Sequence, residues 1–252
     1  MKIALCGKGG VGKSSLASLL ILSFLHAGYK VLAIDADPSP HLARLLEIPQ
    51  EVTPLAEMMD LLAERAQKSG PYYTLNPKID DLPEKFAITK DGLRLMVLGA
   101  IRTAGGGCAC PEQTVLKRLL TYLLLTSKEV VLVDMEAGVE HFGRASVTPM
   151  DVLLVITQPL KGSIETTRQI LKLAKELGLE RVYVIGNKVR TKEQEELLQG
   201  EFGDRYLLSF PPDEELERRE FEGRGLWTYR GVLFSKAQEL REKLTELLHE
   251  IT

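Results

Sequence analysis

The sequence predicts an α/β fold in which a mostly parallel, twisted sheet of seven or eight strands carries helices on both faces. Two observations predict it. Short apolar and β-branched runs alternate with longer segments of helical periodicity along most of the chain, which is the pattern of repeated strand–helix units. A glycine-rich loop also separates the first apolar run from the first helical segment, in the arrangement that phosphate-binding loops require.

The expected elements follow from these periodicities. The strands are expected at Lys2–Cys6, Lys30–Asp35, Leu93–Leu98, Val130–Asp134, Val152–Thr157, Arg181–Asn187 and Arg205–Phe210. The helices are expected at Lys13–Ala27, Leu55–Lys68, Glu112–Thr126, Ser163–Leu177, Lys192–Gln199 and Phe234–Glu250. No internal repeat or low-complexity linker divides residues 1–252, so one domain is expected. Residues 52–107 follow no regular period and are expected to form an irregular insertion.

Composition bounds the class of protein. The chain has 252 residues, of which 44% are hydrophobic and 27% charged, enough for one doubly wound domain without disulfides. A net charge of -3 gives no general attraction to nucleic acid or to an anionic membrane. The first apolar run stops at Gly7, too early for a signal peptide, and Leu16–Leu25 is too short to cross a bilayer. We therefore expect a cytoplasmic protein with no membrane or nucleic-acid partner.

The glycine-rich loop predicts nucleotide binding. The pattern G-x-x-x-x-G-K-[ST] is met by Gly7, Gly12, Lys13 and Ser14. Such glycines let backbone N–H groups turn toward a phosphate, Lys13 would reach the β- and γ-phosphates of ATP or ADP, and Ser14 would ligate Mg²⁺. A plain glycine-rich turn is the alternative, but it leaves the lysine–serine pair unexplained. The predicted contacts are Gly7, Lys8, Gly9, Gly10, Val11, Gly12, Lys13, Ser14 and Ser15, and the fold is expected to be of the P-loop NTPase type.

Acidic residues end two of the expected strands. Asp35 and Asp37 follow the second strand, and Asp134 follows the apolar run 131–133. Ligands gather at the carboxyl ends of parallel strands, so these side chains are the first candidates for a metal site. Asp134 is expected to hold Mg²⁺ directly or through water. The alternative is that these aspartates only form turns.

Lys8 narrows the class of nucleotide-binding protein. A lysine at this position of the loop resembles the deviant Walker A motif of the signature-lysine ATPases, which include the nitrogenase iron protein, the arsenite-pump ATPase and the septum-site and plasmid-partition ATPases. The resemblance implies slow ATP hydrolysis to ADP and phosphate in a homodimer, with Lys8 reaching nucleotide bound by the partner subunit. It further implies that Asp37 orients or deprotonates the attacking water, that Asp35 supports the magnesium shell, and that Gly138 lets a second switch approach the γ-phosphate. A solvated loop lysine is the alternative.

Two later segments are candidates for contact with the base. Asn187, with Lys188 beside it, resembles the position of these ATPases whose amide reads the adenine edge. Phe210 and Pro211 resemble the loop that borders the base. Both strings are short, and ordinary turns are the alternative for each.

The sequence Cys108-Ala109-Cys110-Pro111 predicts a metal site. The two cysteines are too close for an ordinary disulfide, and in a reducing compartment such a pair is more naturally a pair of ligands. Cys110 would precede a helix with Pro111 in its first turn, where the helix dipole lowers a thiol pKa. Two thiolates are half of a tetrahedral site, and a second subunit could supply the other half. Burial of two small residues is the alternative, and the third cysteine, Cys6, is expected in the core.

Over nearly its full length the chain resembles the CooC-type nickel-insertion ATPases, which mature carbon monoxide dehydrogenase and, through a related accessory protein, acetyl-CoA synthase. The resemblance rests on residues 7–14, 35–38, 74–78, 108–110, 136–141 and 187–190. It implies an ATP-dependent homodimer that binds Ni(II), or Zn(II) in vitro, through Cys108 and Cys110, with one of these enzymes as client. Glu136 stands where many members carry a smaller residue, and His141 is either a link between the two sites or structural.

A spatial-regulator ATPase of the septum-site or partition type, acting on membrane or DNA, is the alternative function. A membrane-binding member would need a basic amphipathic C-terminal helix, whereas the expected helix at residues 234–250 carries a mixed, glutamate-rich polar face. A DNA-binding member would need a basic patch, and the sequence shows none. The sequence therefore favours the metal-handling class.

Overall fold

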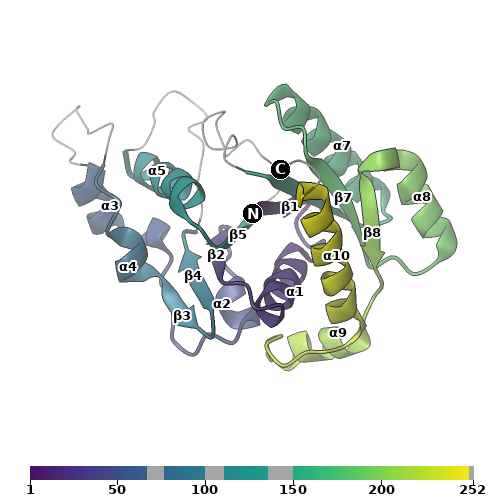
Figure 1. The fold of residues 1–252 in the computed structure, drawn as a ribbon, viewed down its shortest axis with the longest axis horizontal. Helices are drawn as coiled ribbons and strands as arrows, with labels where there is room; N and C mark the ends of the chain where they lie inside the picture. Colours follow the sequence, from purple (N-terminus) through teal and green to yellow (C-terminus); the bar gives the residue numbers. More distant parts are fainter. Residues whose placement is uncertain (67–76, 100–110, 136–149, 250–252) are drawn as a thin grey trace.

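The computed structural model describes residues 1–66, 77–99, 111–135 and 150–249, and its centre is one eight-stranded sheet (Figure 1). The strand order is β3-β4-β2-β5-β1-β6-β7-β8. Every neighbouring pair is parallel except β3 and β4, which form an antiparallel edge hairpin. The predicted fold class is confirmed. The strands are β1 (Lys2–Gly7), β2 (Val31–Ala36), β3 (Ile88–Lys90), β4 (Leu93–Val97), β5 (Val130–Met135), β6 (Val152–Thr157), β7 (Val182–Asn187) and β8 (Tyr206–Phe210).

Helices connect the strands and cover both faces of the sheet (Figure 1). They are α1 (Lys13–His26), α2 (Leu42–Leu45), α3 (Met59–Ala66), α4 (Leu82–Phe86), α5 (Pro111–Thr126), α7 (Lys161–Glu176), α8 (Lys192–Phe202), α9 (Glu214–Phe221) and α10 (Val232–His249), with 3₁₀ turns η1 (Leu55–Glu57) and η2 (Gly203–Arg205). Among the helices of the described part, none is long and apolar enough to cross a membrane.

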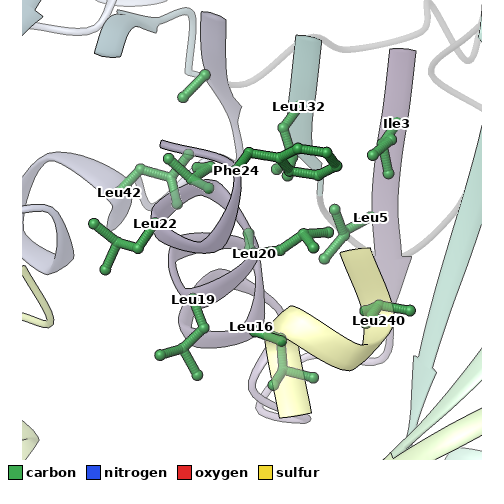
Figure 2. Close-up of a cluster of buried hydrophobic side chains, with 14 of the residues drawn as sticks. Ile3, Leu5, Leu16, Leu19, Leu20, Leu22, Phe24, Leu42, Leu132 and Leu240 are labelled. Atoms are coloured by element: carbon green, nitrogen blue, oxygen red, sulfur yellow. The ribbon is translucent and has the colours of Figure 1, made fainter. Parts of the chain in front are cut away.

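Alternating side chains of each strand enter two separate apolar cores. Ile3 and Leu5 of β1 face α1 and α10, which lie side by side, whereas Ala4 and Cys6 face α5 and α7. Figure 2 shows Leu20 and Phe24 of α1 close to the strand side chains. A parallel sheet needs apolar side chains on both faces because its crossover helices cover both, and β1, β2, β5 and β6 meet this requirement. The core position predicted for Cys6 is confirmed, since the residue is fully buried.

The sequence-based boundaries differ from the structure in specific places. The seven predicted strands are present with ends shifted by one residue or not at all, but the three-residue strand β3 was missed. The helix predicted at 55–68 is divided into η1 and α3, and its last two residues lie outside the described part. Residues 77–92, expected to be irregular, hold α4 and β3, and β3 pairs with the predicted strand β4, which in turn pairs with β2 in the main sheet. The short helices α2, α4 and α9 were not predicted because they are too short for a clear period.

Candidate nucleotide-binding site

The phosphate-binding loop joins the carboxyl end of β1 to the first turn of α1. Its two flanking glycines are required by close contacts and by backbone conformation. Gly7 has φ of 148°, and a Cβ on it would collide with the carbonyl oxygen of Ile156 in the neighbouring strand β6. Gly12 has φ of 93°, and a Cβ there would lie 2.5 Å from the side-chain nitrogen of Asn187. Any larger residue at either position would therefore displace the loop or its neighbour.

A pocket of about 440 Å³ opens beside this loop, within the size range of small-molecule sites. One wall is the loop and the start of α1, where Lys13 is only 7% exposed. The opposite walls are the segment after β2, the ends of β7 and β8, and α9. The predicted residues that line it are Gly9, Gly10, Gly12, Lys13, Ser14, Ser15, Asp37, Asn187, Lys188 and Pro211.

Phe210, one of the two base contacts predicted in this segment, lies behind the pocket lining. The residue is 1% exposed and belongs to the core that faces α10, so it does not line the pocket. Alternation along β8 explains this placement, because Leu208 and Phe210 point to the same buried face. Pro211, the next residue, does line the pocket.

Asp35 holds the segment that carries Asp37. Its Oδ2 accepts the backbone N–H groups of His41 and Leu42, both at 2.9 Å, and its Oδ1 accepts the N–H of Asp37 at 3.2 Å. Burial raises the pKa of Asp35 to about 6, although these hydrogen bonds lower it. The carboxylate thus fixes the turn into α2 and leaves Asp37 at the pocket. Its predicted part in the magnesium shell stays a prediction.

Asp134 lies beside Asp35 in the sheet, because β5 pairs with β2 in that register. The side chain is fully buried, and neither carboxylate oxygen has a hydrogen-bond partner among the described residues. Burial, and then the charge of Asp35, raise the pKa of Asp134 to about 7, while the Ser14 hydroxyl and the Lys13 ammonium lower it. A buried carboxylate without a partner is costly unless a cation balances it. Because Mg²⁺ prefers oxygen ligands, Asp134 and Ser14 fit a magnesium ion.

Asn187 lies at the end of β7 and contacts the phosphate-binding loop directly. Its Nδ2 donates to the carbonyl of Val11 at 2.7 Å, and its Oδ1 accepts the N–H of Lys188 at 3.0 Å. Lys188 adopts a left-handed backbone with φ of 55°, uncommon for a lysine, and it lines the pocket. The predicted pair therefore lies at the pocket, and the bond to Val11 is an additional contact that the sequence did not indicate.

Several pocket residues were missed by the sequence reasoning. They are Ser39, His41 and Arg44 after β2, and Leu216, Glu217 and Glu220 of α9. A signal for α9 was present: Asp213 precedes an acidic first turn, and its Oδ1 accepts the N–H of Leu216 at 2.7 Å as an N-cap. The other carboxylate oxygen of Asp213 accepts the buried Tyr229 hydroxyl at 2.8 Å, which fixes this wall to the C-terminal core.

Three predicted site residues, Cys108, Cys110 and Gly138, lie outside the described residues, as do Glu136 and His141. The described part resumes at Pro111, where α5 begins. Lys8 is exposed. Its ammonium lies next to Gly162 in the first turn of α7, where a Cβ added to the glycine would be 2.9 Å from Lys8 Nζ.

The parallel sheet, the glycine-rich loop and the buried aspartate pair define a P-loop nucleotide-binding protein of the ATPase class. The chain belongs to the family described as the CobQ/CobB/MinD/ParA nucleotide binding domain, whose model matches residues 3–226. It is 41% identical over 251 residues to an uncharacterized ATP-binding protein of Methanocaldococcus jannaschii, covering 97% of this chain and 96% of that protein. It is also 41% identical over 196 residues to the carbon monoxide dehydrogenase accessory protein CooC of Rhodospirillum rubrum, covering 75% and 74%. The MinC:MinD cell division protein complex of Aquifex aeolicus shares the fold, with a TM-score of 0.70, 19% identity, and coverage of 98% and 96%.

The buried Asp134 predicts that the free energy of unfolding of the nucleotide-free protein depends on pH. Below about pH 4 the Asp134 carboxyl is protonated in both the folded and the unfolded protein. Between about pH 4 and the folded-state pKa of about 7, it is ionised in the unfolded protein but still protonated in the folded protein. The free energy of unfolding of the wild type should therefore fall, relative to Asp134→Asn, by more than about 1 kcal/mol as pH rises across that window. Urea denaturation at pH 5, 6, 7 and 8 measures it. Asp60→Asn, at an exposed position of α3, is the control, and parallel pH profiles for wild type and Asp134→Asn would contradict the assignment.

Proposed function

We propose that this protein is an ATP-dependent metallochaperone that binds nickel through Cys108 and Cys110 and assists its insertion into carbon monoxide dehydrogenase or acetyl-CoA synthase. One observation carries the proposal: a close cysteine pair stands directly before α5 in a chain that is 41% identical to a carbon monoxide dehydrogenase accessory protein. The nucleotide pocket supplies the energy-coupling half of this function, and the cysteine pair supplies the cargo site.

The proposed ATP chemistry uses residues at the carboxyl ends of three strands, β1, β2 and β5. The loop N–H groups and Lys13 bind the phosphates, with the α1 dipole directed at the same point. Asp134 and Ser14 hold the metal, which when bound neutralises charge on the phosphates. Asp37 orients the attacking water. Its side chain lines the pocket, and its Oδ1 accepts the Ser39 N–H at 2.9 Å, which limits its rotation while leaving Oδ2 for a water.

The proposed active form is a homodimer with nucleotide between the subunits. Lys8 supports it, because its exposed ammonium does not line the pocket of its own subunit and so can serve a neighbour. In this arrangement each Lys8 adds a positive charge to the phosphates of the partner subunit. ATP would then hold the subunits together more tightly than ADP.

The proposed metal site is shared by the same dimer. Two thiolates per subunit make four, which is the number that a closed tetrahedral site requires. ATP-driven association would bring the two pairs together, and hydrolysis would separate them and release the metal to the client enzyme. The septum-site and partition ATPase structures that share the fold are 19% identical to this chain, so they support the fold alone and not the membrane- or DNA-acting alternative.

Lys13 and Asp37 have separable roles, which predicts different defects. Lys13→Ala should lose productive nucleotide binding, since it removes the phosphate-binding cation. Asp37→Asn should bind ATP nearly as wild type but lose turnover by roughly a hundredfold or more, the range for loss of a general base. Equilibrium binding of a fluorescent ATP analogue and single-turnover hydrolysis measure the two effects. Normal hydrolysis by Asp37→Asn would rule out the water-orienting role.

Lys8→Ala tests the dimer. The variant should bind ADP as a monomer but fail to associate when ATP is added, because the phosphates lose the cation from the second subunit. Light scattering with and without a non-hydrolysable ATP analogue measures association, and Lys8→Arg, which keeps the charge, is the matched control. ATP-dependent association of Lys8→Ala at wild-type concentrations would remove the proposed role of Lys8.

The cysteine pair predicts metal binding at one Ni(II) or Zn(II) per dimer. Cys108→Ser and Cys110→Ser should each weaken it by at least about tenfold, and the affinity should fall as pH falls because thiolates must be deprotonated. Elemental analysis after dialysis and competition with a chelator measure stoichiometry and affinity. Cys6→Ala is the control, since Cys6 is buried in β1. Unchanged metal binding by both serine variants would refute the proposed metal site while leaving the ATPase assignment intact.

A further inference from the structure

We infer that Asn187 is a positioning residue that fastens the phosphate-binding loop to the end of β7, and that its first task is to hold this loop rather than to read the base. The inference depends only on nucleotide binding, so failure of the nickel proposal would not affect it. Val11 and Asn187 are 176 residues apart in sequence, yet a 2.7 Å hydrogen bond joins them.

The orientation of the carboxamide is fixed by its partners. The Val11 carbonyl can only accept a hydrogen bond, and the Lys188 N–H can only donate one. The nitrogen of Asn187 must therefore face the loop and its oxygen must face Lys188, as the structure has them. Asparagine provides both a donor for the Val11 carbonyl and an acceptor for the Lys188 N–H. Aspartate and leucine offer no donor for that carbonyl.

The surroundings leave this side chain little freedom. Asn187 is 6% exposed, and Val11 is 3% exposed and anchored in the core with α1. Its Nδ2 atom lies 2.5 Å from the position that a Cβ on Gly12 would take, so only glycine leaves room for it there. The N–H of Lys188 donates to the carboxamide oxygen at 3.0 Å, which holds the group in place from the β7 side.

This contact joins the two halves of the pocket. The N–H of Val189 donates to the carbonyl of Phe210 at 3.1 Å, and Asn187 pairs with Phe210 in the sheet register. The segment that follows Phe210 carries Pro211 and Asp213, which line the pocket. The carboxamide thus ties the phosphate-binding loop to the end of β7, whose backbone in turn pairs with the segment that carries Pro211 and Asp213. Loosening it should weaken every ligand that uses the phosphate-binding loop, with or without a base.

Three ligands distinguish holding the loop from reading the base. ATP has phosphates and adenine, inosine triphosphate has the same phosphates with a different base edge, and inorganic triphosphate has no base. Affinities are measured by calorimetry with magnesium for the wild type, Asn187→Ala and Asn187→Asp. Asn187→Asp keeps the acceptor for Lys188 but places an oxygen against the Val11 carbonyl.

We expect both variants to bind all three ligands more weakly by a similar factor of roughly ten or more, the effect of leaving a buried carbonyl unpaired. The ratio of ATP to inosine triphosphate affinity should stay at its wild-type value. A fall in the ratio of ATP to inosine triphosphate affinity, with unchanged affinity for inorganic triphosphate, would overturn the inference and favour a role in reading the base. Unchanged affinity for all three ligands would also overturn it.

Gln194→Ala is the matched control, because the Gln194 side-chain amide accepts the N–H of Arg190 at 2.8 Å in the same segment but does not line the pocket. It should leave all three affinities as they are. Thermal unfolding without ligand checks that the variants are folded. If Asn187→Ala does not fold, Asn187→Asp carries the test, since it preserves side-chain volume and the bond from Lys188.

Discussion

The burial of two carboxylates side by side is the constraint on which the site depends. The register of β2 and β5 sets Asp35 against Asp134 inside the sheet, where neither is exposed to solvent. Two neighbouring negative charges in such a place are strongly unfavourable unless each is compensated. The structure compensates them differently: Asp35 receives three backbone N–H groups, whereas Asp134 has no hydrogen-bond partner among the described residues.

This difference in hydrogen bonding suggests a structural role for Asp35 and a metal-binding role for Asp134. Asp35 holds the turn that presents Asp37 through its hydrogen bonds, whereas Asp134 is the proposed ligand of a magnesium ion beside Ser14. Asn187 has the same relation to the phosphate-binding loop as Asp35 to the segment after β2, since each is a buried side chain that hydrogen-bonds to the backbone of that segment. The segments that carry Lys13, Asp37 and Ser14, the groups proposed to contact phosphate, water and metal, are therefore held by hydrogen bonds of Asp35 and Asn187.

The sequence predicted the features that are encoded locally. The strands and long helices follow from apolar periodicity, and the loop follows from glycines, lysine and serine within eight residues. Other features depend on contacts across the chain. The bond between Asn187 and Val11 spans 176 residues, and the inward turn of Phe210 follows from the packing of β8 against α10. Helix α9 was missed although Asp213 marked its start, because its polar sequence shows little apolar period.

Proton release on magnesium–nucleotide binding tests the central claim most directly. If the raised pKa of Asp134, about 7, reflects a carboxyl that must ionise to hold the metal, binding near pH 6 should release about one proton per site. For the wild type, proton release should decline toward zero above pH 8. For Asp134→Asn, it should be absent near pH 6. Calorimetry of Mg–ADP binding in buffers of different ionisation enthalpy measures the number. Equal proton release by wild type and Asp134→Asn across this range would contradict the account.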